Sequence, residues 1–281
     1  MAMEIVSNID DVRRVRWTDA SATWGLVPTM GYLHEGHLQL IRKARSENDR
    51  IGVSIFVNPI QFNNPEDLEK YPRDADRDID LLKQVGVDLL WTPTPDIVYP
   101  KGYQTYVDVT QIAQFLEGAS RPGHFRGVAT VVAKLFNVFQ PTRAYFGQKD
   151  AQQVVVIRRM VEDLDFNLQV VACPTVREED GLAMSFRNVR LSPEHRRQAA
   201  CLHAALLAAQ KAFLSGIRDA ALLKKTVQGV IANAPAARID YVSAADPETL
   251  EELDTITGGV LLSLAVYFNA VRLIDNIILK E

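Results

Sequence analysis

The sequence predicts an α/β protein, with a Rossmann-like parallel sheet covered by helices on both faces and a smaller α+β domain after it. Short apolar runs alternate with helical patterns through residues 1–176. The pattern at 127–139 repeats apolar side chains at three- and four-residue steps, which is typical of a helix with one buried face. Strands that are apolar throughout indicate a parallel sheet that is buried on both sides.

The larger domain, residues 1–176, is expected to hold the Rossmann-like sheet. Its strands are predicted at 24–27, 51–57, 89–92, 105–109, 143–146 and 168–172. Its helices are predicted at 36–48, 75–85, 127–139 and 150–164. Ligands of such a sheet bind beyond the carboxyl ends of the strands, so function is expected in the loops there.

A charged, turn-like segment at 177–181 is expected to be a hinge to the smaller domain, residues 177–281. Ser192 can cap a helix there, with Pro193 at its first position. That helix is expected to run to about Ser215. A second helix and two strands are predicted at 220–232, 238–244 and 260–268. These elements complete a small α+β domain.

Composition argues against several classes of partner. The 281 residues carry 31 basic and 35 acidic side chains, a formal net charge of -4, so no clustered basic surface for nucleic acid is indicated. The two cysteines, Cys173 and Cys201, have no metal-binding spacing and are expected to be reduced thiols. The N-terminus lacks a signal-peptide pattern, and the longest apolar run, 259–271, is too short to cross a bilayer. A cytoplasmic protein without nucleic-acid or membrane partners is expected.

The most informative segment is PTMGYLHEGH at 28–37, between a predicted strand and a predicted helix. Glycines at 31 and 36 let the backbone approach a ligand closely, and a helix start offers free N–H groups to an anion. His34 and His37 are three residues apart, so both imidazoles can lie on one face of the helix start. There they could donate hydrogen bonds to the same phosphate.

Two other interpretations of this histidine pair exist. A zinc site would need a third ligand, and no nearby cysteine, aspartate or histidine completes one, so no metal-binding set is expected. The pair could also be ordinary surface histidines. The sequence contains no G-x-x-x-x-G-K-[ST] loop and no G-x-G-x-x-G at the first helix, so ATP would be held by the histidine loop.

Two segments carry candidates for substrate recognition. Asn58 and Gln61 follow a buried strand, and their amides could bind a hydroxy acid or could equally fasten the loop. Arg121 and His124 lie in a loop before a helix, where a guanidinium suits a carboxylate or could simply be a solvated basic turn.

Two more segments carry candidates for phosphate binding. Lys149 follows the strand at 143–146, where an ammonium could neutralise phosphate oxygens. Asp150 could cap the next helix, and Gln153 lies one turn into it. Ser185 and Arg187 follow the expected hinge and could close over the phosphates from the second domain.

Taken together, these five motifs resemble the pantothenate synthetase family, the pantoate–β-alanine ligases. The resemblance extends from 24 to 191 and resumes at 271–276. The His-x-Gly-His element alone is similar to the wider nucleotidylyltransferase superfamily. The family resemblance implies ATP-dependent formation of pantoyl-adenylate from pantoate, followed by attack of the β-alanine amine to give pantothenate and AMP. It also implies Mg2+ with the ATP, and a homodimer.

The resemblance further implies roles for particular residues, assigned by matching motif positions. The implied catalytic residues are His37, His34, Lys149, Ser185 and Arg187. The implied nucleotide-binding residues also include Met30, Gly31, Gly147, Asp150, Val176 and Met184. The implied pantoate- and β-alanine-binding residues are Gln61, Gln153, Asn58, Arg121 and His124.

The sequence departs from the family pattern at two positions. Phe186 stands where the family usually has a second serine, and activity is expected to be retained because Ser185 and Arg187 remain. Gln148 stands where glutamate is frequent and is expected to face solvent. The alternative functions are a nucleotidylyltransferase that joins AMP to a phosphorylated acceptor, and a non-catalytic nucleotide-binding protein.

Overall fold

The computed structural model describes residues 3–280 as two compact units. The first unit contains the residues up to Gly147 together with Val156–Cys173. The second contains Gln148–Val155 together with the residues from Pro174 onward. Two functional expectations, that residues 1–176 bind ATP and pantoate and that the smaller domain at 177–281 acts as a lid over them, stay predictions.

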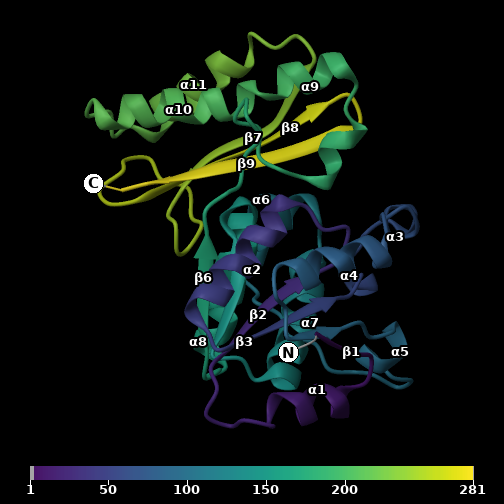
Figure 1. Cartoon of the computed structure of the whole chain (residues 1–281). Coiled ribbons are helices and arrows are strands. Elements are labelled where there is room, and N and C mark those ends of the chain that lie inside the picture. The colour runs from purple at the N-terminus through teal and green to yellow at the C-terminus, as the bar shows by residue number, and fades with distance from the viewer. Residues whose placement is uncertain (1–2, 281) are drawn as a thin grey trace. The chain divides into compact units, whose positions relative to one another are not determined.

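The first unit is built on a six-stranded sheet in which all neighbouring strands are parallel (Figure 1). The strand order is β1-β4-β3-β2-β5-β6. The strands are β1 (Glu4–Val6), β2 (Trp24–Thr29), β3 (Arg50–Ile55), β4 (Leu89–Trp91), β5 (Arg143–Gly147) and β6 (Gln169–Cys173). From β2 the chain proceeds outward through β3 and β4, whereas from β5 it proceeds in the opposite direction to β6. The switch point of this Rossmann-like order therefore lies between β2 and β5.

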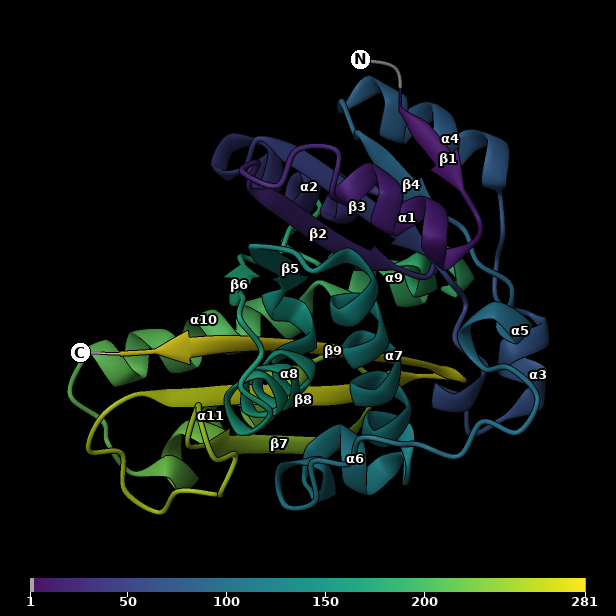
Figure 2. The same cartoon turned by 90° about the horizontal axis from the view of Figure 1, so that it is seen from below.

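Helices cover both faces of this sheet, which confirms the predicted fold class (Figure 2). The helices in this part of the chain are α1 (Ile9–Arg16), α2 (Glu35–Glu47), α3 (Pro65–Glu69), α4 (Ala75–Gln84), α5 (Pro95–Val98), α6 (Leu116–Ser120), α7 (His124–Phe139) and α8 (Ala151–Asp163). Apolar residues of α2 and α4, including Ile41 and Leu82, form one core with Val27 and Val53 of the sheet. On the other side α7 approaches β3 so closely that a Cβ at Gly52 would lie 2.6 Å from Phe139 Cε1. Only glycine fits that contact.

The ladder between β2 and β5 is short. It pairs Gly25 with Arg143 and Leu26 with Ala144, near the amino ends of the two strands. By contrast, β2 pairs with β3 along its whole length, from Trp24 to Thr29. Among the described residues, β2 and β5 are not paired beyond these two positions, so their carboxyl halves share no backbone hydrogen bonds. This is the edge from which the candidate loops leave the sheet.

The second unit contains an antiparallel sheet in the order β7-β8-β9, with helices that follow the 177–181 segment. Its strands are β7 (Ala237–Ala245), β8 (Val260–Phe268) and β9 (Val271–Leu279). Its helices are α9 (Pro193–Ala199), α10 (Cys201–Leu214) and α11 (Ala220–Ile231). Figure 1 shows α10 and α11 side by side over one face of this sheet, where Leu206, Phe213 and Leu223 join its core. This is the predicted smaller α+β fold.

Several local predictions are wrong. Residues 105–109 form no strand, because the Val107 N–H donates to Thr130 Oγ1 at 3.0 Å instead of to a neighbouring strand. The long helix expected from Pro193 is interrupted at Ala200 and continues as α10. The strands β1 and β9 and the helix α1 were not predicted from the sequence.

The segment 177–181 is not a loose linker. Arg177 forms a paired salt bridge with Asp275, at 2.6 and 3.0 Å, and an isolated bridge pairs Arg177 with Ala183. Arg196 bonds the carboxylates of Glu178 and Asp180 on the other side of the turn. The segment is therefore a fastened turn within the second unit.

Candidate functional site

The loop after β2 places the histidine pair at the start of α2. The rings of His34 and His37 lie together, with centroids 4.2 Å apart. His34 is the N-cap of α2, and its Nδ1 accepts from the Gly36 N–H at 3.1 Å. The His34 N–H in turn donates to His37 Nδ1 at 3.3 Å. The two imidazoles thus form a reciprocal capping box.

This capping fixes where each ring carries its proton. A ring nitrogen that accepts from a backbone N–H bears no hydrogen, so a neutral imidazole in this geometry carries its proton on Nε2. Both His34 and His37 accept at Nδ1. Each ring is therefore arranged as a donor at Nε2, which is the polarity that phosphate oxygens require.

A buried amide network fixes the orientation of Gln61. Asn58, which is 1% exposed, donates from Nδ2 to the Gly127 carbonyl at 3.1 Å and to Gln61 Oε1 at 2.9 Å. Asn58 Oδ1 accepts from the Tyr99 hydroxyl at 2.8 Å. Because a backbone carbonyl can only accept, the Gly127 contact determines the orientation of the Asn58 amide and, through it, that of Gln61.

The consequence is that Gln61 turns its NH2 group away from Asn58, where Nε2 lies 3.3 Å from Met30 Sδ. Burial raises the pKa of Tyr99 well above its ordinary value, so its hydroxyl stays a donor. Asn58, predicted as a substrate ligand, has its amide committed to this network. It positions Gln61, which is left to offer a donor.

Arg121 and His124 gather around the backbone carbonyl of Gln61. His124 is 8% exposed, and its Nδ1 lies 2.9 Å from Gln61 O. Arg121 Nη1 lies 3.2 Å from His124 Nε2, and its Nη2 donates to Gln61 O at 3.4 Å. Both ring nitrogens of His124 therefore have partners, Arg121 in its own loop and the carbonyl of Gln61. The arrangement supports a fastening role for His124, and the predicted contact with β-alanine stays a prediction.

In the second unit, Asn276 of β9 holds the backbone that carries Lys149. Its Nδ2 donates to the carbonyls of Gln148 and Lys149 at 3.0 and 2.9 Å. Gln148 Nε2 returns a bond to Asn276 Oδ1 at 3.1 Å. The expectation that Gln148 faces solvent is therefore wrong, because its carboxamide completes this pair of bonds. These contacts explain why 148–155 belongs with the second unit.

Lys149 has a positively charged neighbour in the same unit. Burial lowers the pKa of Lys149, and the Arg187 guanidinium lowers it further, whereas Asp150 and Asp275 oppose that shift. Asp150 is exposed next to it. An ammonium and a guanidinium close enough to repel each other favour an anion between or beside them.

The segment 184–187 leads into the 3-10 helix η4 (Phe186–Arg190). Ser185 caps that helix and accepts from the Arg187 N–H at 3.2 Å. Met184 N–H donates to the Val176 carbonyl at 2.9 Å. Arg187 donates to the Arg272 carbonyl at 3.3 Å, and its guanidinium lies 5.8 Å from the centre of the Phe186 ring. Ser185 Oγ accepts as a cap and retains its own O–H as a donor.

The predicted residues thus form two groups, one in each unit. The first unit carries Met30, Gly31, His34, His37, Asn58, Gln61, Arg121, His124 and Gly147. The second carries Lys149, Asp150, Gln153, Val176, Met184, Ser185 and Arg187. That both groups surround one ATP stays a prediction.

Sequence reasoning missed several residues that hold these groups in place. Tyr99 fixes Asn58, Asn276 fixes the Lys149 backbone, and Asp78 accepts from the Tyr32 and Leu33 N–H groups. Asn276 lies in the segment 271–276 that supports the family resemblance, which was the available signal. Nothing local in the sequence distinguishes Asp78 from the other acidic residues of α4.

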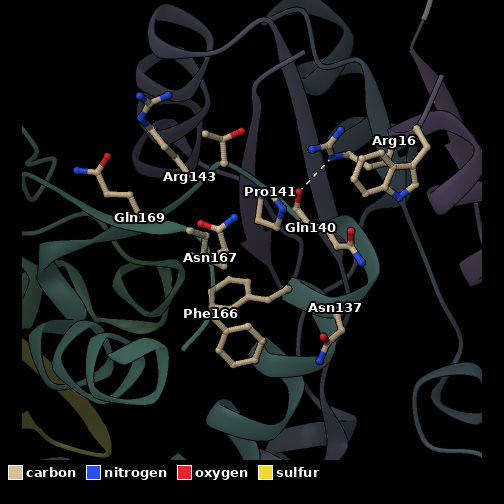
Figure 3. Close-up of a pocket in the computed structure, with 12 residues that line it drawn as sticks. Arg16, Asn137, Gln140, Pro141, Arg143, Phe166, Asn167 and Gln169 are labelled. Atoms are coloured by element: carbon tan, nitrogen blue, oxygen red, sulfur yellow. Dashed lines mark hydrogen bonds between the residues drawn. The ribbon is translucent and has the colours of Figure 1, made fainter. Parts of the chain in front are cut away.

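A separate hollow of about 650 Å³ lies in the first unit (Figure 3). Its lining includes Arg16 at the end of α1, Gln140 after α7, and Arg143 and Gln169 at the beginnings of β5 and β6. Arg16 donates to the Gln140 carbonyl at 3.1 Å. In a parallel sheet the amino ends lie at the edge opposite the carboxyl ends. The hollow contains none of the predicted site residues.

The described residues also bear on metal binding and on membrane insertion. Within residues 3–280, no group of three histidine, cysteine, aspartate or glutamate side chains is arranged to hold a metal ion. The histidine pair instead bonds to backbone N–H groups. No described helix combines the length and the apolar character that crossing a membrane requires.

A Rossmann-like order, a histidine-capped helix after β2 and a lysine after β5 together define an enzyme of the α/β nucleotide-binding class. The family model for pantoate-β-alanine ligase matches residues 4–278. A pantothenate synthetase of Roseiflexus sp. (strain RS-1) is 54% identical over 278 residues, covering 99% of this chain and all of the relative. This chain belongs to the pantoate–β-alanine ligase family, the pantothenate synthetases.

Solved structures agree with this assignment. A crystal structure of pantothenate synthetase from Thermus thermophilus is 48% identical, with a TM-score of 0.92, and covers 98% of this chain and 99% of its own. The pantoate-β-alanine ligase from Francisella tularensis, complexed with "Beta-gamma ATP and Beta-alanine", is 36% identical with a TM-score of 0.79. That alignment covers 98% of this chain and 97% of the Francisella chain.

Proposed function

We propose that this enzyme condenses pantoate with β-alanine, using ATP, to give pantothenate, AMP and diphosphate. The observation that carries the proposal is the reciprocal histidine cap at the switch point of the sheet, in a chain of this family. The Francisella relative complexed with an ATP ligand and β-alanine supports the same pair of substrates here.

The first step forms pantoyl-adenylate. A carboxylate oxygen of pantoate attacks the α-phosphorus of ATP, the bond from that phosphorus to the bridging oxygen breaks, and diphosphate leaves. Neither reactant needs a proton, so the chain's task is to stabilise charge on the phosphate oxygens. His34 and His37 would donate from Nε2, and Lys149 and Arg187 would supply positive charge. Met30, Gly31, Gly147, Asp150, Val176, Met184 and Ser185 would line the nucleotide.

The second step forms the amide. The β-alanine amine attacks the carbonyl carbon of the adenylate, the bond to the AMP oxygen breaks, and the nitrogen loses a proton. AMP is a good leaving group, whereas a free carboxylate is a poor electrophile, which is why activation is required. Gln61 and Gln153 would hold pantoate, and Arg121 would attract the carboxylate of β-alanine.

Mg2+ is expected with the ATP. The described residues contain no cluster of three acidic or imidazole ligands. The side chains therefore fit an ion that is held mainly by phosphate oxygens and water, as Mg2+ commonly is. No step is assigned to the ion. The homodimer and the cytoplasmic location stay predictions.

The proposal is tested by pantoate-dependent exchange of labelled diphosphate into ATP, followed by pantothenate formation when β-alanine is added. Exchange that requires pantoate and proceeds without β-alanine is the expected result. A nucleotidylyltransferase would instead exchange with a phosphorylated acceptor and ignore the amine. Purified protein that gives neither exchange nor pantothenate with all three substrates would contradict the proposal and favour a non-catalytic role.

A further inference from the structure

The loop that delivers the histidine pair has an unusual backbone. Gly31 and Tyr32 are consecutive residues with φ of +83° and +50°. The left-handed region is open to glycine but unfavourable for a residue with a Cβ, such as tyrosine. Such a conformation persists only where surrounding contacts impose it. Something must therefore hold Tyr32.

Asp78 of α4 supplies those contacts. Its Oδ2 accepts from the Tyr32 N–H at 2.7 Å, and its Oδ1 accepts from the Leu33 N–H at 2.8 Å. The residue is 1% exposed. A Cβ added to Gly31 would lie 3.1 Å from Asp78 Oδ2, so the carboxylate also lies close to the Gly31 backbone.

The carboxylate of Asp78 suits the two loop N–H groups that it accepts from. An ionised carboxylate is acceptor-only and offers two oxygens, and here two successive N–H groups use one oxygen each. Among residues 3–280, the ion pair recorded for Asp78 is with Arg77, at 3.7 Å. The two short bonds to the loop are therefore the principal polar contacts of this buried group.

We propose that Asp78 is a positioning residue for the adenylation step. By holding Tyr32 and Leu33 it sets the position of the His34 cap and, through the capping box, of His37. This inference rests on the proposed function, because it assumes that the histidine pair binds the phosphates of ATP. A purely structural role would stabilise the first unit without affecting nucleotide use.

Asp78→Asn separates these two roles. A carboxamide has one acceptor oxygen, so one of the two loop N–H groups would face an NH2 donor and the loop would have to move. Leu82→Ala is the matched control, because Leu82 lies in the same helix and is fully buried, and its apolar side chain accepts no hydrogen bond from the loop N–H groups. It lowers stability by opening a cavity.

The measurements are KM for ATP and kcat in pantoate-dependent exchange, together with Tm, for the full chain. We expect Asp78→Asn to raise the KM for ATP or lower kcat by at least about tenfold, as the loss of a buried acceptor does. Leu82→Ala should lower Tm at least as much while both kinetic constants stay close to wild type. Wild-type constants in Asp78→Asn, or proportional losses of Tm and activity in both variants, would overturn the proposal.

A second measurement tests the mechanism directly. Tyr32→Gly removes the cost of the left-handed conformation, so Asp78→Asn should lose less activity in that background than in wild type. Losses that simply multiply would show that Asp78 does not act through Tyr32. If the wild-type enzyme catalyses no exchange, the proposed function fails, and that result is distinct from a failure of this inference.

Discussion

At the scale of single residues, the site depends on the polarity of a few atoms. His34 and His37 accept backbone N–H groups at Nδ1 and so become donors at Nε2. Gln61 has its oxygen engaged by Asn58 and so becomes a donor too. In each case an obligatory backbone group decides the orientation of the side chain. The candidate site is thereby arranged to meet oxygen acceptors.

Gln61→Glu tests this polarity. The glutamate can still accept from Asn58, but its second oxygen replaces an amide donor and would face an anionic substrate. We expect KM for pantoate to rise roughly ten- to a hundredfold, the usual consequence of leaving a polar partner unsatisfied, while KM for ATP changes little. Steady-state kinetics with each substrate varied in turn make the comparison. An unchanged KM for pantoate would remove Gln61 from the pantoate site.

At the scale of elements, β9 organises the second unit around two polar residues. Asp275 binds Arg177 of the 177–181 turn, and Asn276 binds the backbone at 148–149. Both are at most 5% exposed. One strand therefore fastens two segments that are distant in the sequence and carry or flank candidate site residues.

Asp275→Asn should destabilise the protein. The substitution removes the negative charge that pairs with Arg177 and leaves the guanidinium without a counter-charge. We expect the free energy of unfolding to fall by about 3 kcal/mol. This is the low end for buried ion pairs, because 21% of the Arg177 side chain is exposed. Denaturant unfolding measures the change. The control is Lys224→Met, which breaks the more exposed pair with Glu252 and should cost less than about 1 kcal/mol. Equal losses in both variants would contradict the prediction.

His203 of α10 should make the second unit sensitive to acid. Burial lowers the pKa of His203, and the Arg177 guanidinium lowers it further, although Asp275 opposes the shift. The folded state therefore binds a proton less readily than the unfolded chain, whose histidine pKa is about 6.5. Neutral His203 therefore contributes fully to the stability of the folded state above the unfolded pKa of about 6.5. This contribution is lost as the pH falls from there toward the lower pKa of the folded state.

Thermal unfolding at about pH 7.5 and about pH 5.5 tests this sign, because the two values bracket the unfolded histidine pKa. We expect the wild-type Tm to fall more between them than the Tm of His203→Gln, which cannot titrate there. A larger fall in the variant would show that protonation of His203 does not oppose folding.

At the scale of the whole molecule, the proposed chemistry requires residues from both units to act together. His37→Ala alone should cut the exchange rate by on the order of a hundredfold, as the loss of a charge-stabilising donor does. If Lys149 acts on the same triphosphate, the double variant His37→Ala/Lys149→Ala should be scarcely slower than the slower single variant, because groups that work as a unit are not additive. His195→Ala, on α9, is the control histidine.

The outcome of this cycle decides whether one site exists. Fully multiplicative losses would indicate that His37 and Lys149 act independently, and the assignment of both to one ATP would then be wrong. Near-normal exchange in His37→Ala would remove that residue from the catalytic group.

The sequence by itself determined the parts of this protein that depend on neighbouring residues. Apolar runs and helix periodicity predicted β2, β5, α4 and α8 to within a few residues, and the strand at 260–268 coincides with β8. The loop at 28–37 was recognised because glycine, histidine and a helix start are close in the chain. Caps and periodicity act over a few residues, so a single segment carries the whole signal.

Only the tertiary structure decided the contacts between distant segments. Asp78 meets Tyr32 across 46 residues, and Asn276 meets the Gln148 carbonyl across 128. Residues 4–6 become β1 by pairing with β4, whereas 105–109 have strand-like composition and no strand partner. The physical reason is that a buried polar group or a strand edge is satisfied by a partner in space. No local pattern records which distant partner that is.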